Sequence, residues 1–296
     1  MTAADAGRGR TTPARRWRAP IAPLIIALVA LIGLTILVYP TAAAWFAQRE
    51  QSRLLGEAGE VTDAHAERNA ASIAQAREYN DALRAGARIE ANERLPLGGG
   101  EIADDALDYR AVLDDDATGV MTRVRIPRID VDLPTFHGTS DETLLRGLGH
   151  LEGTSLPVGG AGTHAVITGH RGLADARMFT DLDRVRVDDT LTLTTFGEVL
   201  AYRVVSTTVV DPDQTESLQA QEGRDLVTLV TCTPLGINSQ RILVTAERIY
   251  PTPKADREAG LADPHASDAP WWAAILGGGA LVAGVYVWRS GIVSVR

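Results

Sequence analysis

Cysteine is almost absent from this chain, since Cys232 is the only one among 296 residues. A single thiol cannot form an internal disulfide, and the sequence lacks the Cys-any-any-Cys and His-any-any-any-His spacings that commonly hold zinc. We therefore expect no metal and no disulfide framework. A free cysteine is more often an inert part of a core than a reactive group, so the neighbours of Cys232 must decide its role.

Positive charge is scarce outside the two ends of the chain. Lys254 is the only lysine, so arginine supplies nearly all of the 29 basic residues, a bias that indicates GC-rich coding. Five arginines precede residue 20 and two follow residue 288, whereas the segment between them is more acidic than the whole chain, whose net charge is −9. Nucleic acid is excluded as an expected partner because its phosphates need positive charge.

Long apolar runs are few, and the two that exist indicate a membrane protein. Residues 21–39 and 271–288 carry no charge and are each long enough to cross a hydrocarbon core. Arginines lie beyond the outer end of both runs, so the positive-inside rule puts both termini in the cytoplasm and the rest outside. A cleavable signal peptide is the alternative for the first run, because "TAAAW" follows it. The lipid bilayer is an expected partner.

These runs predict seven parts of the chain. They are a cytoplasmic tail (1–20), a membrane helix (21–39), an extracytoplasmic helical stalk with a possible lid loop (41–117), a strand-rich domain (118–250), a linker (251–270), a second membrane helix (271–288) and a short tail (289–296). The stalk is rich in alanine and charge with sparse apolar positions, which predicts helices that pack one narrow face. Gly56, Gly59 and Gly86 are the expected breaks.

Beyond residue 118 the sequence is typical of short strands. Apolar and polar residues alternate in stretches such as "RVRIPRIDVDLPTF", and turn residues separate these stretches at intervals of roughly ten to twenty residues. The pattern predicts a mainly β domain, either a small barrel or a sandwich. Residues 141–154, "DETLLRGLGHLEGT", predict one short helix among the strands.

Three residues of this domain stand where chemistry is possible. Cys232 ends one alternating strand and Arg241 opens the next, after the loop "TPLGINSQ", so both are expected on neighbouring antiparallel strands. The guanidinium would offer planar, always-charged donors to an oxyanion. His170 closes another strand between Gly169 and Gly172, in a bend that would lift it toward a cleft and let it transfer protons.

Other catalytic arrangements of these residue types have less support in the sequence. A papain-like site would need an orienting asparagine, for which Asn238 is a candidate. His164 opens the same strand as His170 and, like His137 and His150, is expected to have a structural role through hydrogen bonds.

Several short motifs, in their order along the chain, resemble the sortase family. "TLVTC" (228–232), followed by "NSQR" (238–241), is similar to the sortase pattern in which Thr-Leu-any-Thr-Cys precedes an arginine. "TGHRGL" (168–173) matches the family's histidine motif. "IPRIDVDLP", "HGTS", "GHLEGTSLPVGG" and "MFTDLDRV" are similar to stretches typical of class C, the pilin-polymerising sortases, here of actinobacterial type. The resemblance covers nearly the whole strand-rich domain.

The resemblance implies a closed eight-stranded β-barrel with an active cleft and no cofactor. Cys232 would attack the Thr–Gly bond of a Leu-Pro-any-Thr-Gly-like (LPXTG) sorting signal and form a thioacyl enzyme. His170 would exchange protons with the leaving and entering amines, and Arg241 would bind the substrate backbone and the oxyanion. The substrate-binding residues implied by the same motifs are Thr168, Leu229 and Thr231. The implied acceptor is a pilin lysine amine at the surface of a Gram-positive cell.

One family feature is missing, and three alternatives stay open. Class C sortases commonly carry an Asp-Pro-aromatic lid, but residues 90–105, "EANERLPLGGGEIADD", contain no such tripeptide, so a lid would use other residues or be absent. The alternatives to pilus assembly are attachment of surface proteins to a cell-wall amine in peptidoglycan, hydrolysis by a cysteine endopeptidase, and a non-catalytic membrane-tethered scaffold.

Overall fold

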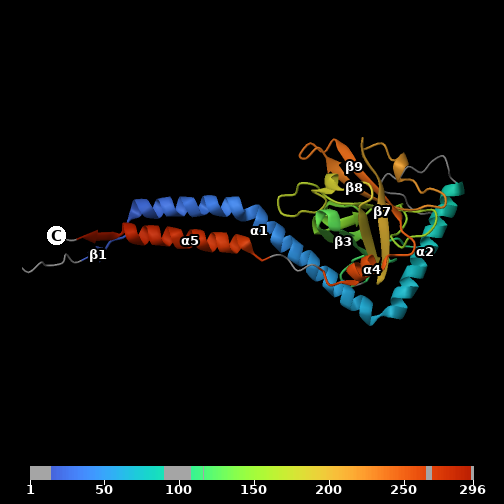
Figure 1. The fold of residues 1–296 in the computed structure, drawn as a ribbon, viewed down its shortest axis with the longest axis horizontal. Helices are drawn as coiled ribbons and strands as arrows, with labels where there is room; N and C mark the ends of the chain where they lie inside the picture. Colours follow the sequence, from blue (N-terminus) through green and yellow to red (C-terminus); the bar gives the residue numbers. More distant parts are fainter. Residues whose placement is uncertain (1–14, 90–107, 116, 265–268, 295–296) are drawn as a thin grey trace, which may run out of the picture. The chain divides into compact units, whose positions relative to one another are not determined.

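The computed structural model describes residues 15–89, 108–115, 117–264 and 269–294 (Figure 1). The expected lid loop of residues 90–105 lies outside the described residues. The chain divides into two compact units, Met1–Ala43 with Ala269–Arg296, and Ala44–Asp268. The seven predicted parts stay a prediction, whereas the fold class is tested directly by the strands.

Eight strands of the second unit form a closed barrel in the order β2-β3-β4-β5-β8-β9-β7-β6. Their bounds are β2 Thr122–Ile126, β3 Val131–His137, β4 Leu148–His150, β5 Thr163–Thr168, β6 Thr190–Thr195, β7 Glu198–Val210, β8 Asp225–Thr233 and β9 Gln240–Arg248. Neighbouring strands are antiparallel except for the parallel pairs β3–β4 and β5–β8. The predicted mainly β class and closed eight-stranded barrel are therefore confirmed.

Burial explains both kinds of strand pattern in the sequence. In β2 the side chains of Val124 and Ile126 face the core, and Arg123 and Arg125, which alternate with them, face outward, which produces the alternation. Strand β8 lies between β5 and β9 and is buried from its start to Thr231, so its sequence is a continuous run of apolar residues and threonines. Cys232 is the first residue of β8 that reaches solvent.

The start of β8 is held by a buried carboxylate. Asp225 accepts hydrogen bonds from the Tyr250 hydroxyl (2.6 Å), the Tyr202 hydroxyl (3.1 Å) and the backbone N–H of Gly160 (2.9 Å). Burial and this carboxylate raise the pKa of Tyr250 to about 12, so both hydroxyls stay protonated donors at neutral pH. These bonds set where β8 begins and hence where it ends at the cysteine.

Two helices of the predicted stalk pack on the barrel. Helix α1 spans Ile21–Ala64 and α2 spans Ala66–Ile89. In α2, Ile73 and Tyr79 are buried in a cluster with residues that precede or join the barrel, including Met121 and Leu156. Figure 1 shows α2 running along one side of the barrel. The narrow apolar face of this region thus covers the barrel.

The break between α1 and α2 differs from the sequence expectation. Gly56 and Gly59 lie inside α1, and the helices separate at His65 instead. A glycine in a helix costs about 1 kcal/mol relative to alanine. Burial of Leu55 beside Val120 and Phe136 outweighs this cost, because a fully buried leucine contributes about 1.5–3 kcal/mol.

Two short helices also flank the barrel strands. Helix α3, Asp141–Arg146, starts at Ser140, whose hydroxyl accepts a hydrogen bond from the N–H of Thr143. It is shorter than the segment 141–154 suggested, because Leu148–His150 forms β4. The described residues of this unit also contain three 3₁₀ turns: η1 Pro127–Ile129, η2 Leu182–Arg184 and η3 Glu216–Leu218.

Helix α4, Lys254–Leu261, occupies part of the segment for which the sequence indicated only a polar linker. Its Gly260 is buried so closely against β6 and β7 that a Cβ there would lie 2.7 Å from Val199 and 3.0 Å from Thr194. The Arg125 side chain donates a hydrogen bond to the carbonyl of Ala259 (2.8 Å). The barrel unit therefore extends past residue 250.

The first unit contains the beginning of α1 and helix α5, Trp271–Ser290, which lie side by side (Figure 1). Both helices are long and apolar enough to cross a membrane. Strand β1, Arg15–Trp17, pairs antiparallel with β10, Ile292–Ser294. Within this unit, Gly279 of α5 faces Leu34 of α1, where a Cβ would lie 2.4 Å from the leucine side chain.

Candidate active site

Cys232 and Arg241 are direct partners in the antiparallel ladder between β8 and β9. Residues directly opposite each other in such a ladder point to the same face of the sheet with their Cβ atoms about 4.5–5.5 Å apart. The sequence spacing predicted neighbouring antiparallel strands, and the register adds that the two residues are opposite. The guanidinium therefore lies within reach of the space beside the sulfur.

His170 leaves the barrel next to Cys232. Strands β5 and β8 are parallel, and Thr168 is the register partner of Val230. Both His170 and Cys232 follow this pair by two residues, so they lie at the same end of the barrel. The N–H of Gly169 donates to the carbonyl of Val230 (3.1 Å), which continues the ladder up to the residue before the histidine.

The bend at His170 depends on glycine. A Cβ on Gly169 would lie 2.6 Å from Leu148 and 2.7 Å from Phe179, so no larger residue fits. Gly172 has a φ of +75°, in the left-handed region that favours glycine. The carbonyl of His170 accepts a hydrogen bond from the N–H of Phe179 (3.0 Å), which closes the loop back on itself.

The three side chains are half-buried and available for contact with a substrate. Cys232 is a free thiol. Among the described residues, the His170 ring has no hydrogen-bond partner. Arg241 donates from Nη1 to the carbonyls of Asn238 (2.9 Å) and Gln240 (3.0 Å). These bonds anchor one nitrogen of the guanidinium, and its other nitrogens have no hydrogen-bond partner among the described residues.

The expected substrate-binding residues divide into two groups. Thr168 is half-buried at the end of β5, at the same edge as His170. Leu229 and Thr231 are completely buried, which corrects the expectation that they line a substrate site. Leu229 belongs to the barrel core, and the Thr231 hydroxyl donates to the carbonyl of Gly169 (2.7 Å). Thr231 thus holds the histidine loop and does not face a substrate.

Exposed apolar side chains near the site were missed by the sequence analysis. Leu235 and Ile237 of the loop between β8 and β9 are 54% and 71% exposed, and Val209 of β7 is 55% exposed. Val209 and Val210 pair with Ile242 and Arg241 in the ladder. The apolar residues Leu235 and Ile237 within the loop "TPLGINSQ" were the signal in the sequence that could have indicated them. Leu235 and Ile237 belong to the loop between Cys232 and Arg241, whereas Val209, as the partner of Ile242, points to the face of the sheet opposite to Arg241.

The other histidines of the barrel have structural hydrogen bonds. The His164 ring bonds the Gln219 carbonyl (3.0 Å) and the Thr228 hydroxyl (2.7 Å). Burial lowers the pKa of His150 to about 4 and also lowers the pKa values of His137 and His164, so all three are neutral at pH 7. In the part of the chain that the structure describes, no group of three or more His, Cys, Asp or Glu residues could hold a metal ion.

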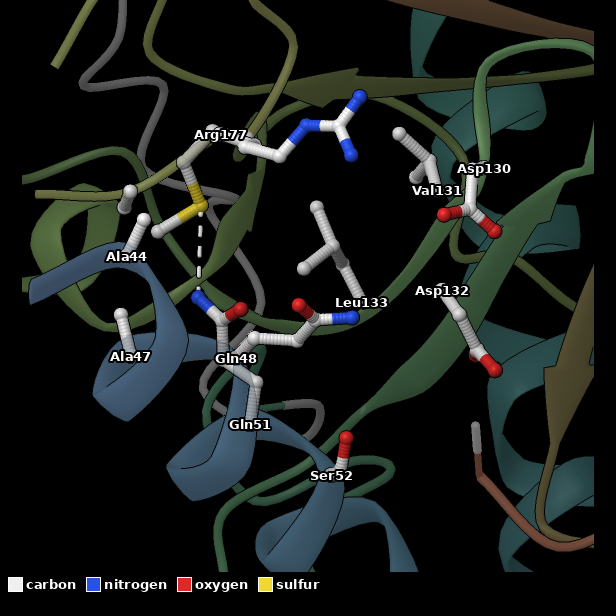
Figure 2. Close-up of a pocket in the computed structure, with 12 residues that line it drawn as sticks. Ala44, Ala47, Gln48, Gln51, Ser52, Asp130, Val131, Asp132, Leu133 and Arg177 are labelled. Carbon is white, nitrogen blue, oxygen red and sulfur yellow. Dashed lines mark hydrogen bonds between the residues drawn. The ribbon is translucent and has the colours of Figure 1, made fainter. Parts of the chain in front are cut away.

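A small cavity of about 40 Å³ lies between α1, the start of β3 and residues 176–178 (Figure 2). Gln51 of α1 extends into it and places its amide nitrogen 3.5 Å from the sulfur of Met178. Arg177, Asp130 and Asp132 line the opposite side. None of Cys232, His170 and Arg241 lines this cavity, so it is separate from the candidate site.

Comparisons with known proteins match the strand-rich domain to one family. The Sortase domain family matches residues 124–249. The crystal structure of sortase C-1 from Actinomyces oris is 44% identical, and the match covers 61% of this chain and 98% of that one with a TM-score of 0.53. Sortase C1 of GBS Pilus Island 1 is 42% identical, with 61% and 88% covered and a TM-score of 0.54.

Curated relatives match at lower identity. Sortase A of Bacillus anthracis is 26% identical over 149 residues, which are 50% of this chain and 65% of the relative. The chain spans less than two thirds of the length of the curated relatives that it matches. The match of the family model falls on the strand-rich domain, which contains His170, Cys232 and Arg241.

Proposed function

Because this chain belongs to the sortase family, we propose that it is a membrane-anchored cysteine transpeptidase whose nucleophile is Cys232. The observation that carries the proposal is the register of three adjacent segments. Cys232 lies opposite Arg241 across the β8–β9 ladder, and His170 follows the parallel neighbour β5 at the same edge. A nucleophile, a proton carrier and a cation are then gathered at one end of the barrel.

In the first half of the proposed reaction, an LPXTG-like sorting signal is cleaved. The thiolate of Cys232 attacks the carbonyl carbon of the Thr–Gly bond, and the electron pair moves to the oxygen. Arg241 stabilises this oxyanion by hydrogen bonds and charge. As the carbonyl reforms, the C–N bond breaks, and the leaving glycine amine takes a proton from His170. A thioester joins the signal to the enzyme.

In the second half, an amine replaces the enzyme. His170, now neutral, takes a proton from the incoming amine as its nitrogen attacks the thioester carbonyl. The C–S bond then breaks, an amide forms, and the sulfur leaves as the thiolate. The exposed apolar side chains of Leu235 and Ile237, in the loop between Cys232 and Arg241, are suited to contact the leucine and proline of the signal. The proposed chemistry needs no cofactor.

The acceptor that we propose is a lysine amine of a pilin, which would make the enzyme a pilus-assembly sortase. Two similar solved structures support this choice, because one is a sortase C-1 and the other is sortase C1 of a pilus island. The class C-like motifs of the strand-rich domain support it as well. The second candidate is a cell-wall amine, which would attach surface proteins to peptidoglycan.

We further propose that the barrel unit lies outside the cell membrane, with both termini in the cytoplasm. The apolar side chains of α5, such as Leu281 and Val282, are exposed rather than packed in a protein core. The β1–β10 ladder supports a common side for the two termini, and the arginines at both ends favour the cytoplasm. The relatives named above from Bacillus anthracis and GBS come from Gram-positive bacteria, which fits this location.

The proposal is tested with the full chain in lipid nanodiscs and a peptide that contains an LPXTG sequence. Intact mass spectrometry should find a thioester adduct on wild type that disappears when a lysine-bearing peptide is added, with formation of the joined product. C232A should give neither species. A cell-wall-like amine accepted in place of lysine would move the assignment to peptidoglycan attachment.

Two outcomes would contradict the transpeptidase. An adduct lost only to water, whichever amine is present, would identify an endopeptidase. A C232A variant that supports surface-protein assembly as well as wild type in cells would identify a non-catalytic scaffold.

A further inference from the structure

Arg171, the residue after His170, turns its side chain into the protein. Only 10% of the side chain is exposed, and each of its three nitrogens is engaged. Nε donates to the carbonyl of Thr180 (3.1 Å), Nη1 donates to the hydroxyl of Thr233 (2.9 Å), and Nη2 pairs with Asp183 (2.9 Å). A side chain held this way cannot also bind a substrate.

The contacts of Arg171 join both sides of the candidate site. Thr233 is the last residue of β8 and follows Cys232 directly. Thr180 and Asp183 belong to the segment that enters η2, and the Thr180 hydroxyl also accepts the N–H of Gly172 (3.1 Å). One guanidinium therefore ties the loop that carries His170 to the end of the cysteine strand and to η2.

We propose that Arg171 is a positioning residue that holds the His170 ring beside the Cys232 sulfur. The proposal rests on the proposed function and deepens it. A loop between two strands is mobile unless side chains fasten it, and a displacement of about 1 Å of a reacting group can cost about 100-fold in rate. The hydrogen bond to Thr233 sets the separation of the two loop ends next to the reacting atoms.

Arginine suits this role better than lysine. Its planar guanidinium donates in several fixed directions at once, whereas a lysine ammonium is a compact charge on a flexible stem. The Asp183 carboxylate is half exposed, so its ion pair contributes less than the buried hydrogen bonds. Directional hydrogen bonding to Thr233 and Thr180, rather than charge, is thus the main contribution of Arg171.

Steady-state kinetics of transpeptidation test the proposal on the full chain in nanodiscs. R171Q should lower kcat by about 100-fold with little change in KM, because the peptide surface is untouched while the proton carrier is displaced. R171K should recover only part of this loss, and D183N should stay within about threefold of wild type. T233V removes only the hydroxyl that accepts the Arg171 hydrogen bond, and it should lower kcat with little change in KM, as R171Q does.

A double-mutant cycle distinguishes the positioning role of Arg171 from a general loss of stability. If Arg171 acts through Thr233, R171Q and T233V together should cost clearly less than the product of their separate effects. The matched control is R177Q, in the same loop, whose side chain is 62% exposed and pairs only with Asp181 among the described residues. R177Q should keep the wild-type kcat. Additive effects of R171Q and T233V would overturn the proposal.

A second readout needs no peptide and separates this proposal from the proposed function. The rate of Cys232 alkylation by iodoacetamide is followed from about pH 5 to about pH 9 in wild type, H170A and R171Q. The R171Q profile should shift from the wild-type profile toward that of H170A, at temperatures where the variant is still fully folded. A wild type that alkylates normally but never joins peptides would refute only the transpeptidase. An R171Q profile equal to wild type, or an H170A profile equal to wild type, would overturn the proposal that Arg171 positions His170.

Discussion

At the scale of single residues, His150 shows how the barrel fixes a protonation state. It is completely buried on β4, with Tyr109 bonding Nδ1 (2.9 Å) and Nε2 donating to the carbonyl of Ser155 (2.9 Å). The Tyr109 hydroxyl also accepts the N–H of Gly138, so this histidine joins strand β4 to the segment that precedes β2. A second proton on the ring would break the bond from Tyr109.

This burial predicts loss of stability in acid. The pKa of His150 is about 4 in the folded chain and 6.5 in the unfolded chain, because burial disfavours the charged ring. Between these values the unfolded state binds a proton that the folded state does not, so the free energy of unfolding falls as the pH is lowered through this window. The expected loss from this group is on the order of 3 kcal/mol.

Urea unfolding of the full chain in detergent micelles, at pH values from about 7 to about 4, measures this effect. H150Q should be less stable than wild type at pH 7 but should lose less stability on acidification. The matched control is H65Q, which removes an exposed histidine between α1 and α2. Parallel pH profiles for wild type and H150Q would contradict the prediction.

The candidate site was only partly predictable at this scale. Spacing along the chain was sufficient to put Cys232 and Arg241 on adjacent strands, because one short loop joins those strands, but the exact register came from the structure. The contact between Arg171 and Thr233 joins residues 62 positions apart, and no local pattern contains it. Leu229 and Thr231 were misassigned because a motif names residues without showing which of them face the core.

At the scale of elements, α4 depends on close packing at one glycine. A Cβ on Gly260 would lie 2.7 Å from Val199, whereas Gly59 inside α1 has no atom within 4 Å of that position. Replacing a helical glycine by alanine normally stabilises the helix by up to about 1 kcal/mol. At Gly260 the overlap with β7 reverses the sign, since overpacking costs about 1–3 kcal/mol.

These two glycines therefore give opposite predictions for the same chemical change. G260A should lower the melting temperature of the barrel unit, and G59A should raise it slightly or leave it unchanged. Circular dichroism of the full chain in micelles, recorded on heating at the strand signal, measures both. If G260A is as stable as G59A, helix α4 does not pack on the barrel as described.

Elements with a strong period were predicted, and elements that depend on tertiary contacts were not. The strands follow from alternation and from turn residues between them. Helix α4 is short and polar, so its place on the barrel rests on Gly260 and on arginines of β2 that bond its last turn. The break at His65 was missed for a similar reason, because packing of Leu55 keeps α1 helical through two glycines.

At the scale of the whole molecule, the β1–β10 ladder joins the two ends of the chain. Trp17 is the register partner of Ile292, and its indole N–H donates to the carbonyl of Trp288 (3.2 Å). Directly opposite residues in an antiparallel pair have Cα atoms about 4.5–5.5 Å apart, which is within the range for a disulfide. Because Cys232 is the only natural cysteine, the C232A chain offers a background free of thiols.

The ladder predicts that W17C/I292C in the C232A chain forms an internal disulfide under mild oxidation in nanodiscs. Mass spectrometry of the digested protein should find the two peptides joined. The matched control is W17C/S294C, in which positions 17 and 294 are diagonal neighbours about 7–8 Å apart. This variant should form far less disulfide. Equal disulfide yields from both variants, or no disulfide in either, would contradict the pairing of β1 with β10.

The adjacency of β5 and β8 also has a consequence for when the protein becomes reactive. Synthesis proceeds from the N-terminus, so His170 is made well before Cys232, and β6 and β7 are made between them. Contacts between distant segments form late in folding because a long loop must close first. A nascent chain, or one interrupted before β8 has entered the barrel, therefore carries no assembled site. Completion of the barrel is therefore the step that assembles the candidate site.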